Sequence, residues 1–135
     1  MLNGTIIEFE GIDRCGKDSL ASAVHKLTNF RYNLRARGMI SQLVYNDKFS
    51  RGIDYKFDYT PIIVYLTVSE EEYWNRCIKT NEPIMDTSID RDLFDKYIDE
   101  AKKKGIVVLE YDTSNRSADD IAKELVIQLK TLIDE

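Results

Sequence analysis

The chain has 135 residues, which suits one domain, and a formal net charge of -5. Its two cysteines are too few for a disulfide framework and lack the spacing of a zinc site. The acidic balance argues against sequence-independent binding of nucleic acid. No apolar run approaches the ~18 residues of a membrane span, and no basic leader opens the chain. We therefore expect a cytoplasmic protein, for which one small anionic ligand remains compatible with the charge.

The first expected elements are a strand and a helix joined by a tight turn. Residues 5–10 are β-branched and bounded by Gly4 and Gly11, which is typical of a strand. From Lys17 to about Asn29, apolar residues recur at helical spacing. Between residues 30 and 60 the pattern loosens to one apolar cluster at 40–44. A strand over 31–36 carries too much charge to be buried.

Periodicity returns in the second half of the chain. Residues 61–68 form a nearly continuous apolar run, typical of a strand covered on both faces. Ser69 and the acidic residues after it predict the start of a helix to Lys79. A second helix is expected from Ser88 to Lys104, a strand over 106–111, and a last helix capped by Ser117. The buried stripe expected on that last helix is Ile121, Leu125, Leu129 and Leu132.

The turn between the first strand and helix carries a phosphate-binding pattern. Residues 11–18, GIDRCGKD, fit GxxxxGK and depart only where Asp18 stands in place of Ser or Thr. In this position the backbone N–H groups of the turn and a helix N-terminus converge on phosphate oxygens. We expect the phosphates to lie against Gly11, Cys15, Gly16 and Lys17, with Lys17 reaching the β- and γ-phosphates. A merely structural turn with a chance lysine is the alternative.

These observations predict the fold class. Strands alternate with helices over residues 1–135, so we expect a single α/β domain with a small, mostly parallel sheet flanked by helices. Together with the glycine turn, this indicates a three-layer sandwich like that of P-loop NTPases. Cys15 lies inside the turn, where a helix N-terminus lowers the pKa of a thiol, although a small filler is the role we favour.

Residues 9–19, FEGIDRCGKDS, resemble the opening of thymidylate kinases, which read FEGxDxxGK followed by two hydroxyl residues. The resemblance implies that Asp13 binds near the sugar 3′-hydroxyl of the acceptor nucleotide. It also implies that Arg14, beside Lys17, is a catalytic cation for the transferred phosphoryl group. The simpler alternatives are that Asp13 only bonds its own turn and that Arg14 is only solvated.

Asp18 and Ser19, which follow the turn, are the candidate ligands for Mg²⁺. A carboxylate at Asp18, beside the expected β-phosphate, is either a Mg²⁺ ligand or a source of repulsion. Ser19 is the second candidate ligand, because its hydroxyl can replace the one missing at position 18, or it simply caps the helix. Both residues are therefore expected at the cofactor site.

Further segments extend the resemblance. Residues 37–45 resemble the segment where a thymidylate kinase has an Asp-Arg pair before a helix with Ser and Tyr, but here the pair reads Ala36-Arg37. The resemblance implies that Arg37 binds the acceptor monophosphate. Residues 61–79 resemble the strand and helix that lead to the lid, which makes Arg76 and Lys79 candidates for donor phosphates. Asn115 lies in the loop that resembles the adenine site.

The resemblance implies Mg²⁺-dependent transfer of the ATP γ-phosphate to a nucleotide, with deoxythymidine monophosphate (dTMP) as the leading acceptor. The chain is shorter than a thymidylate kinase, mainly before Arg37 and in the lid, and the carboxylate expected at Ala36 is missing. The alternatives are therefore a nucleotide-binding protein that has lost turnover and serves regulation or assembly, and a nucleoside or polynucleotide kinase. The expected partner is a small-molecule nucleotide, without membrane or nucleic acid, and a homodimer stays open.

Overall fold

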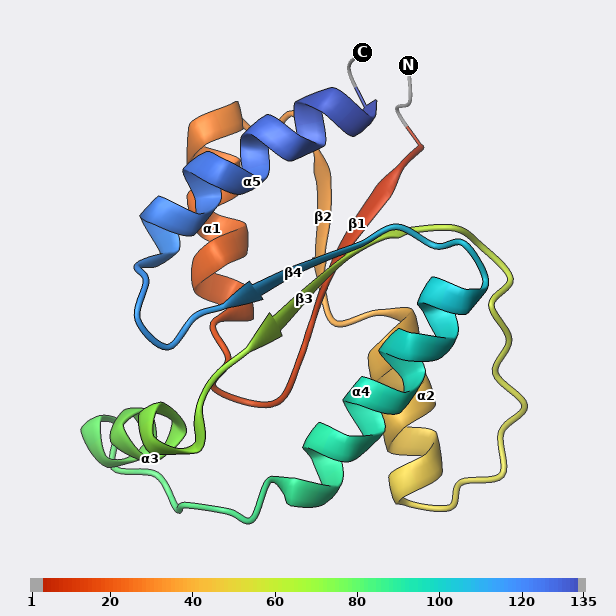
Figure 1. Cartoon of the computed structure of the whole chain (residues 1–135), viewed down its shortest axis with the longest axis vertical. Helices are drawn as coiled ribbons and strands as arrows, with labels where there is room; N and C mark the ends of the chain where they lie inside the picture. The colour runs from red at the N-terminus through yellow and green to blue at the C-terminus, as the bar shows by residue number, and fades with distance from the viewer. Residues whose placement is uncertain (1–3, 134–135) are drawn as a thin grey trace.

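The computed structural model describes residues 4–133, which form a four-stranded parallel sheet with helices on both faces (Figure 1). The strand order is β2-β1-β3-β4. The expected α/β sandwich with a parallel sheet is thus confirmed. The strands are β1 Ile6–Glu10, β2 Asn33–Ala36, β3 Ile62–Thr67 and β4 Val108–Asp112, and the helices are α1 Lys17–Thr28, α2 Met39–Lys48, α3 Glu70–Lys79, α4 Ser88–Lys103 and α5 Ala118–Ile133.

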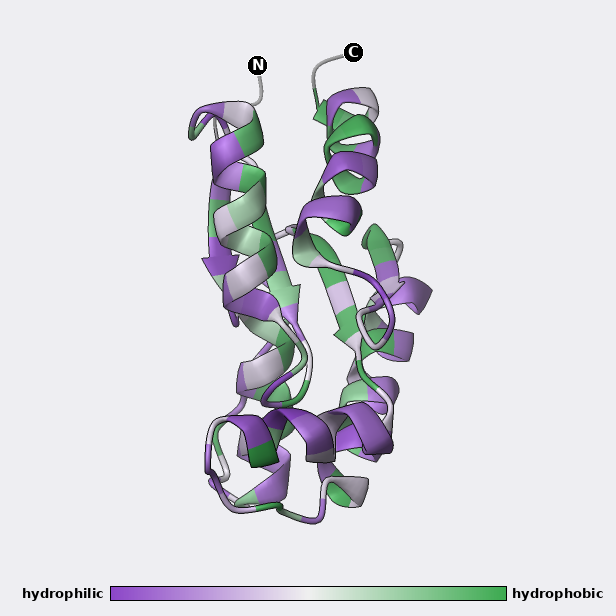
Figure 2. Ribbon diagram, turned by 90° about the vertical axis from the view of Figure 1, so that its left-hand side faces the viewer, coloured by the Kyte–Doolittle hydropathy of each residue, from purple (hydrophilic) through white to green (hydrophobic). Residues whose placement is uncertain are grey.

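The helices form two outer layers. Helices α1 and α5 pack together on one face of the sheet, and α2 and α4 pack together on the other, while α3 lies beyond the end of β3. Figure 2 shows long apolar stretches on the strands between these layers, whereas polar and apolar residues alternate along the helices. The buried apolar residues are concentrated in β1 and β3, while the edge strand β2 is largely exposed. The core therefore lies on both faces of the two inner strands, β1 and β3. Among the described residues, no helix has the length and apolar character that crossing a bilayer requires.

Strand β3 confirms the expectation of a fully covered strand, because five of its six residues are buried. The strand predicted over residues 106–111 begins later than expected, at Val108. Ile106 instead completes the end of α4: Gly105 has φ 81, its N–H donates to the Lys102 carbonyl, and the Ile106 N–H donates to the Ala101 carbonyl. This is the pairing that closes a helix with a left-handed glycine, so Ile106 belongs to the helix cap.

The helix-start predictions hold, and one stripe residue was wrong. The hydroxyls of Ser69 and Ser117 accept hydrogen bonds from the N–H groups of Glu72 and Asp120, both at 3.1 Å. Leu132 lies on the predicted stripe of α5 but is 42% exposed. The last fully buried residue of this helix is Leu129, so the final turn extends beyond the core into solvent.

The segment from 30 to 60 holds more structure than its pattern indicates. Strand β2 exists, and its charge is tolerated because it pairs only with β1 at the edge of the sheet and is largely exposed. Helix α2 follows it, although Gly38 at its N-cap offers no side chain to bond the first turn. The loosened pattern of residues 30–60 did not predict α2, whereas the resemblance of residues 37–45 implied a helix there.

Two buried carboxylates of β1 supply the missing cap. Glu10, which is fully buried, accepts N–H bonds from Gly38 at 2.9 Å, Ile40 at 2.9 Å and Ser41 at 3.2 Å, and a hydrogen bond from the Ser41 hydroxyl. Glu8, also fully buried, accepts the Met39 N–H at 2.9 Å. Negative charge is stabilised at a helix N-terminus, so strand and helix stabilise each other.

Replacing Gly38 with alanine should destabilise the fold. A Cβ at this position would lie 2.1 Å from Cδ of Glu8 and 2.3 Å from both carboxylate oxygens, so α2 must shift or Glu8 must lose its bonds. We expect Gly38→Ala to lower the free energy of unfolding by roughly 2 to 3 kcal/mol in urea denaturation. Gly4→Ala is the control, because nothing lies within 4 Å of its added methyl group. Equal stabilities of the two variants would contradict this packing.

The Glu10 carboxyl should make stability depend on pH. Burial raises its pKa above the ordinary 4.5, against the hydrogen bonds from Ser41, which lower it. The folded chain therefore holds this proton at pH values where the unfolded chain has released it, so stability is present below the ordinary pKa and lost as pH rises through the folded pKa. We expect the difference in unfolding free energy between the native chain and Glu10→Gln to fall as pH rises above the ordinary pKa of 4.5. If this difference in unfolding free energy grew with pH, the raised pKa of Glu10 would be contradicted.

Candidate functional site

Residues 11–16, which we call the phosphate loop after their sequence pattern, follow the carboxyl end of β1 and end directly before Lys17, the first residue of α1. Gly11 has φ 148, and a Cβ there would lie 2.4 Å from the Leu66 carbonyl oxygen and 2.7 Å from Sγ of Cys15. Gly16, at the N-cap of α1, has φ 101. Both glycines are therefore required by the backbone, one for close approach to β3 and the other for a left-handed turn.

Lys17 folds back into the phosphate loop and is 7% exposed. Its Nζ donates to the carbonyl oxygens of Gly11 at 2.9 Å and Ile12 at 2.8 Å, and lies 3.4 Å from Sγ of Cys15. The ammonium group is thus held inside the turn by backbone oxygens that belong to the turn itself. An anion at this helix N-terminus would meet both the N–H groups and this charge.

Cys15 fills the interior of the phosphate loop. Its side chain is fully buried, and burial raises the pKa of the thiol. The positive charge of Lys17 lowers this pKa but does not outweigh the burial, so the net pKa is raised. That direction is opposite to the activation that a helix N-terminus can produce. The carbonyl oxygen of Cys15 accepts a hydrogen bond from the Thr113 hydroxyl at 2.7 Å. Cys15 therefore has the filler role that we favoured, and Thr113 ties the loop to the end of β4.

Arg76 of α3 clamps the phosphate loop from outside. Its guanidinium donates to the Arg14 carbonyl at 2.5 Å and to the Thr113 carbonyl at 2.7 Å, while its Nε donates to Glu72 at 2.9 Å. The sequence made Arg76 a candidate for donor phosphates, but in this structure it bonds the backbone beside the site. The sequence analysis did not single out Thr113 as a residue that contacts the phosphate loop. The one feature that could have indicated it is its position as a hydroxyl residue directly after the last strand.

Asp13 and Arg37, the two residues expected at the acceptor, lie in contact. Nη2 of Arg37 donates to Oδ1 of Asp13 at 2.5 Å, and Nη1 lies 3.4 Å from the Tyr45 hydroxyl. Burial of the guanidinium opposes its charge, but the bonds to Tyr45 and Asp13 outweigh it, so the pKa of Arg37 is raised. The contact arises because β1 and β2 are parallel neighbours, which brings the loops at their carboxyl ends together.

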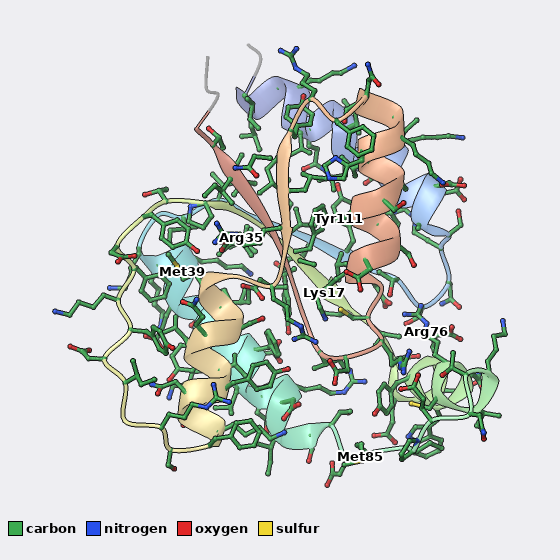
Figure 3. The ribbon with its side chains drawn as sticks, turned by 180° about the vertical axis from the view of Figure 1, so that it is seen from behind. Lys17, Arg35, Met39, Arg76, Met85 and Tyr111 are labelled. Carbon is green, nitrogen blue, oxygen red and sulfur yellow. The ribbon has the colours of Figure 1, made fainter. Side chains whose placement is uncertain are left out.

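A cavity of about 920 Å³ opens at this end of the sheet. Figure 3 labels Lys17, Arg76 and Met85, which come from the start of α1, from α3 and from the segment between α3 and α4. Gly11 and Cys15 lie in the buried wall of the loop, and the exposed Asn115 is outside the lining, whereas Arg116 belongs to it. The expected site residues that line the cavity are Asp13, Arg14, Gly16, Lys17, Asp18, Ser19 and Arg37, together with the candidates for donor phosphates, Arg76 and Lys79.

The four arginines of the cavity lining each contact a carboxylate. These ion pairs are Arg14 with Glu82, Arg37 with Asp13, Arg76 with Glu72 and Arg116 with Glu124. A bound phosphate would therefore compete with resident carboxylates for these guanidinium groups. Glu82 also lines the cavity, so it faces the same space as a ligand would.

Asp18 and Ser19, the expected metal ligands, are exposed residues of the first turn of α1. Within residues 4–133, no group of three or more His, Cys, Asp or Glu side chains is placed to hold a metal ion. This donor set fits Mg²⁺, which commonly takes one or two protein oxygens and completes its shell with phosphate oxygens and water. It does not fit a zinc centre, which needs a closed set of protein ligands.

No known protein-family model matches the sequence, and no curated protein matches it significantly. Among solved structures, the fold is similar to that of the YorR protein from Bacillus subtilis, which was crystallised in complex with phosphorylated GDP. The TM-score is 0.70 and the sequence identity is 20%, over 97% of this chain and 99% of that chain. A likeness at this identity shows that the two chains share a fold over their whole lengths.

Removing the carboxylate of Glu82 should strengthen the binding of phosphate anions. Both partners of the Arg14–Glu82 pair are partly exposed, at 31% and 47%, so solvent screens their attraction. We expect Glu82→Gln to raise the affinity for inorganic pyrophosphate by about two- to fivefold in calorimetric titration at low salt. Glu71→Gln on α3 is the control for the change in net charge, since Glu71 does not line the cavity. Equal gains in both variants would mean that only net charge matters.

Proposed function

We propose that the protein binds a nucleoside triphosphate in the phosphate loop and transfers its γ-phosphoryl group to a second nucleotide. The observation that carries this proposal is the convergence of Lys17, Arg14 and Arg37 on one cavity, at the N-terminus of α1. Phosphoryl transfer depends on positioning the two substrates and on cations near the developing charge, and the cavity with its three cations would serve both needs. The cavity volume is also in the range of nucleotide and cofactor sites.

Each residue would have a distinct role. The loop N–H groups and Lys17 would hold the β- and γ-phosphates of the donor, and Arg14 would leave Glu82 to neutralise the transferred group. Arg37 would bind the acceptor monophosphate, and Asp13, its ion-pair partner, would accept a hydrogen bond from the acceptor sugar. Asp18 or Ser19 would hold Mg²⁺, which shields the phosphate charge when bound.

Two observations suggest which nucleotides to test as donor and acceptor. ATP and dTMP follow from the resemblance of residues 9–19 to thymidylate kinases. The structure of YorR with phosphorylated GDP makes guanine nucleotides a second group to test. The acceptor base is the less constrained part, because the segment between α1 and Arg37 contains only the edge strand β2.

A catalytically impaired binder is the second candidate, and one position favours it. Ala36 lines the cavity beside Arg37, where the resemblance predicts a carboxylate on the metal side. Losing such a group removes a contact that orients metal or substrate in the transition state. In that case the nucleotide would bind without turnover and would serve regulation or assembly.

Calorimetric titration with MgATP and MgGTP, followed by an assay of nucleoside diphosphate release, tests both candidates. The release assay uses a panel of nucleosides and nucleoside monophosphates that includes dTMP and GMP. Binding with acceptor-dependent release supports the enzyme. Binding without release across the panel supports the impaired binder, and absence of binding rejects both.

Lys17→Ala should lower triphosphate affinity by about tenfold or more, because it removes the charge held inside the phosphate loop. Lys26→Ala, an exposed lysine later in the same helix, is the matched control and should bind as the native chain does. Because Lys17 also bonds two loop carbonyls, thermal denaturation of both variants should accompany the titration. A folded Lys17→Ala chain with unchanged affinity would overturn the proposed function.

A further inference from the structure

Glu10 directly precedes the phosphate loop, but its buried carboxylate accepts hydrogen bonds from the start of α2. Its partners are the N–H groups of Gly38, Ile40 and Ser41, all at the start of α2. Glu10 and Gly11 are adjacent in the chain, so the first residue of the phosphate loop and the cap of α2 belong to one stretch of backbone. The start of α2 cannot move relative to that loop without breaking these bonds.

Arg37 directly precedes the capped turn, and its backbone is held on both sides. Its N–H donates to the Phe9 carbonyl at 2.9 Å, and the next N–H, that of Gly38, donates to Glu10 at 2.9 Å. Its φ of 75 lies in the left-handed region, which an arginine adopts at a cost. Such a conformation persists only where the surroundings determine it, and here the determining contacts come from Phe9 and Glu10.

The direction of the Arg37 side chain depends on the same helix. Its guanidinium contacts Asp13 and the hydroxyl of Tyr45, and Tyr45 belongs to α2. The guanidinium carbon also lies 5.8 Å from the centre of the Tyr45 ring. A displacement of α2 would therefore move both the backbone and the side-chain support of Arg37.

Glu8 provides a second attachment for the start of α2. One of its oxygens accepts the Met39 N–H at 2.9 Å, and the other accepts hydrogen bonds from the Tyr59 hydroxyl at 2.5 Å and from Arg35 at 3.1 Å. These partners hold the Glu8 carboxylate, whereas only the α2 turn surrounds that of Glu10 among the hydrogen bonds described for residues 4–133. Glu10 is thus the carboxylate dedicated to the turn that carries Arg37.

We infer that Glu10 is a positioning residue for the acceptor: it holds Arg37 at a set place relative to the phosphate loop, so that Arg37 can bind the acceptor monophosphate. This inference rests on the proposed function and extends it to a residue that does not line the cavity. In-line transfer requires donor and acceptor phosphates at a defined separation, and small displacements of a positioning group are costly in rate.

The test compares Glu10→Ala, Glu10→Gln and Arg37→Ala in steady-state kinetics with ATP and dTMP. Glu10→Ala leaves three N–H groups without their acceptor, so we expect the KM for dTMP to rise roughly tenfold and the KM for ATP to change less than about twofold. Glu10→Gln should restore most of the dTMP affinity, because its amide oxygen can still accept the backbone N–H bonds. Adding Glu10→Ala to Arg37→Ala should cause no further rise, since Glu10 acts through Arg37.

An NMR measurement separates this inference from the proposed function. Rotation of the Arg37 guanidinium, followed by its side-chain nitrogen signals, should be slow in the native chain and in Glu10→Gln, and fast in Glu10→Ala. If the native chain binds neither ATP nor dTMP, the proposed function fails and the NMR signal decides the positioning role alone. Unchanged guanidinium rotation in Glu10→Ala overturns the inference, as does an additive effect in the double variant.

General loss of stability is controlled by Val126→Ala, a buried position of α5 away from the cavity. This variant should melt at a lower temperature than the native chain and keep its dTMP KM and its Arg37 signals. If Glu10→Ala does not fold, Glu10→Asp takes its place, because it withdraws the carboxylate by one methylene from the α2 turn. An equal rise of both KM values in the Glu10 variant and in Val126→Ala would overturn the inference.

Discussion

The bonds between the buried carboxylates of β1 and the first turn of α2 are the constraint on which this structure depends. Two fully buried glutamates on a central strand are costly unless their oxygens are satisfied, and here helix N–H groups satisfy them. The same N–H groups would otherwise lack partners, because Gly38 provides no cap. The carboxylates of β1 and the N–H groups of α2 thus satisfy each other's hydrogen bonds. These bonds fix α2 to the strand that ends in the phosphate loop.

This constraint sets the geometry of the candidate site. Strand β1 ends in the phosphate loop, and the loops at the carboxyl ends of its parallel neighbours meet the same cavity. Arg37 comes from the end of β2, and Arg76 and Thr113 fasten the loop to the elements that follow β3 and β4. The site therefore collects contributions from all four strands at one edge, as open α/β sheets generally do.

The charges in the site are arranged in opposed pairs. An acidic chain concentrates arginines around one cavity, and it balances each of them with a carboxylate from a nearby turn or helix. Unpaired cations at such density would repel one another. A phosphate ligand would thus exchange partners with Asp13 and Glu82, and its affinity would depend on these carboxylates as much as on the arginines.

The sequence alone determined the features that depend on local pattern. Glycine positions identified the tight turn between β1 and α1, β-branched residues between glycines identified β1, and an apolar run identified β3. Ser69 and Ser117 identified helix starts, since each of these signals is encoded within a few residues. The way α2 is capped, the tolerance of β2 for charge and the direct contact of Asp13 with Arg37 were decided only by the tertiary structure. The cap of α2 comes from about 30 residues away in the chain, from carboxylates of β1 that read locally as ordinary strand residues. The charge of β2 is tolerated because the strand lies at the edge of the sheet. Parallel pairing brings these distant groups together, and no local pattern records it.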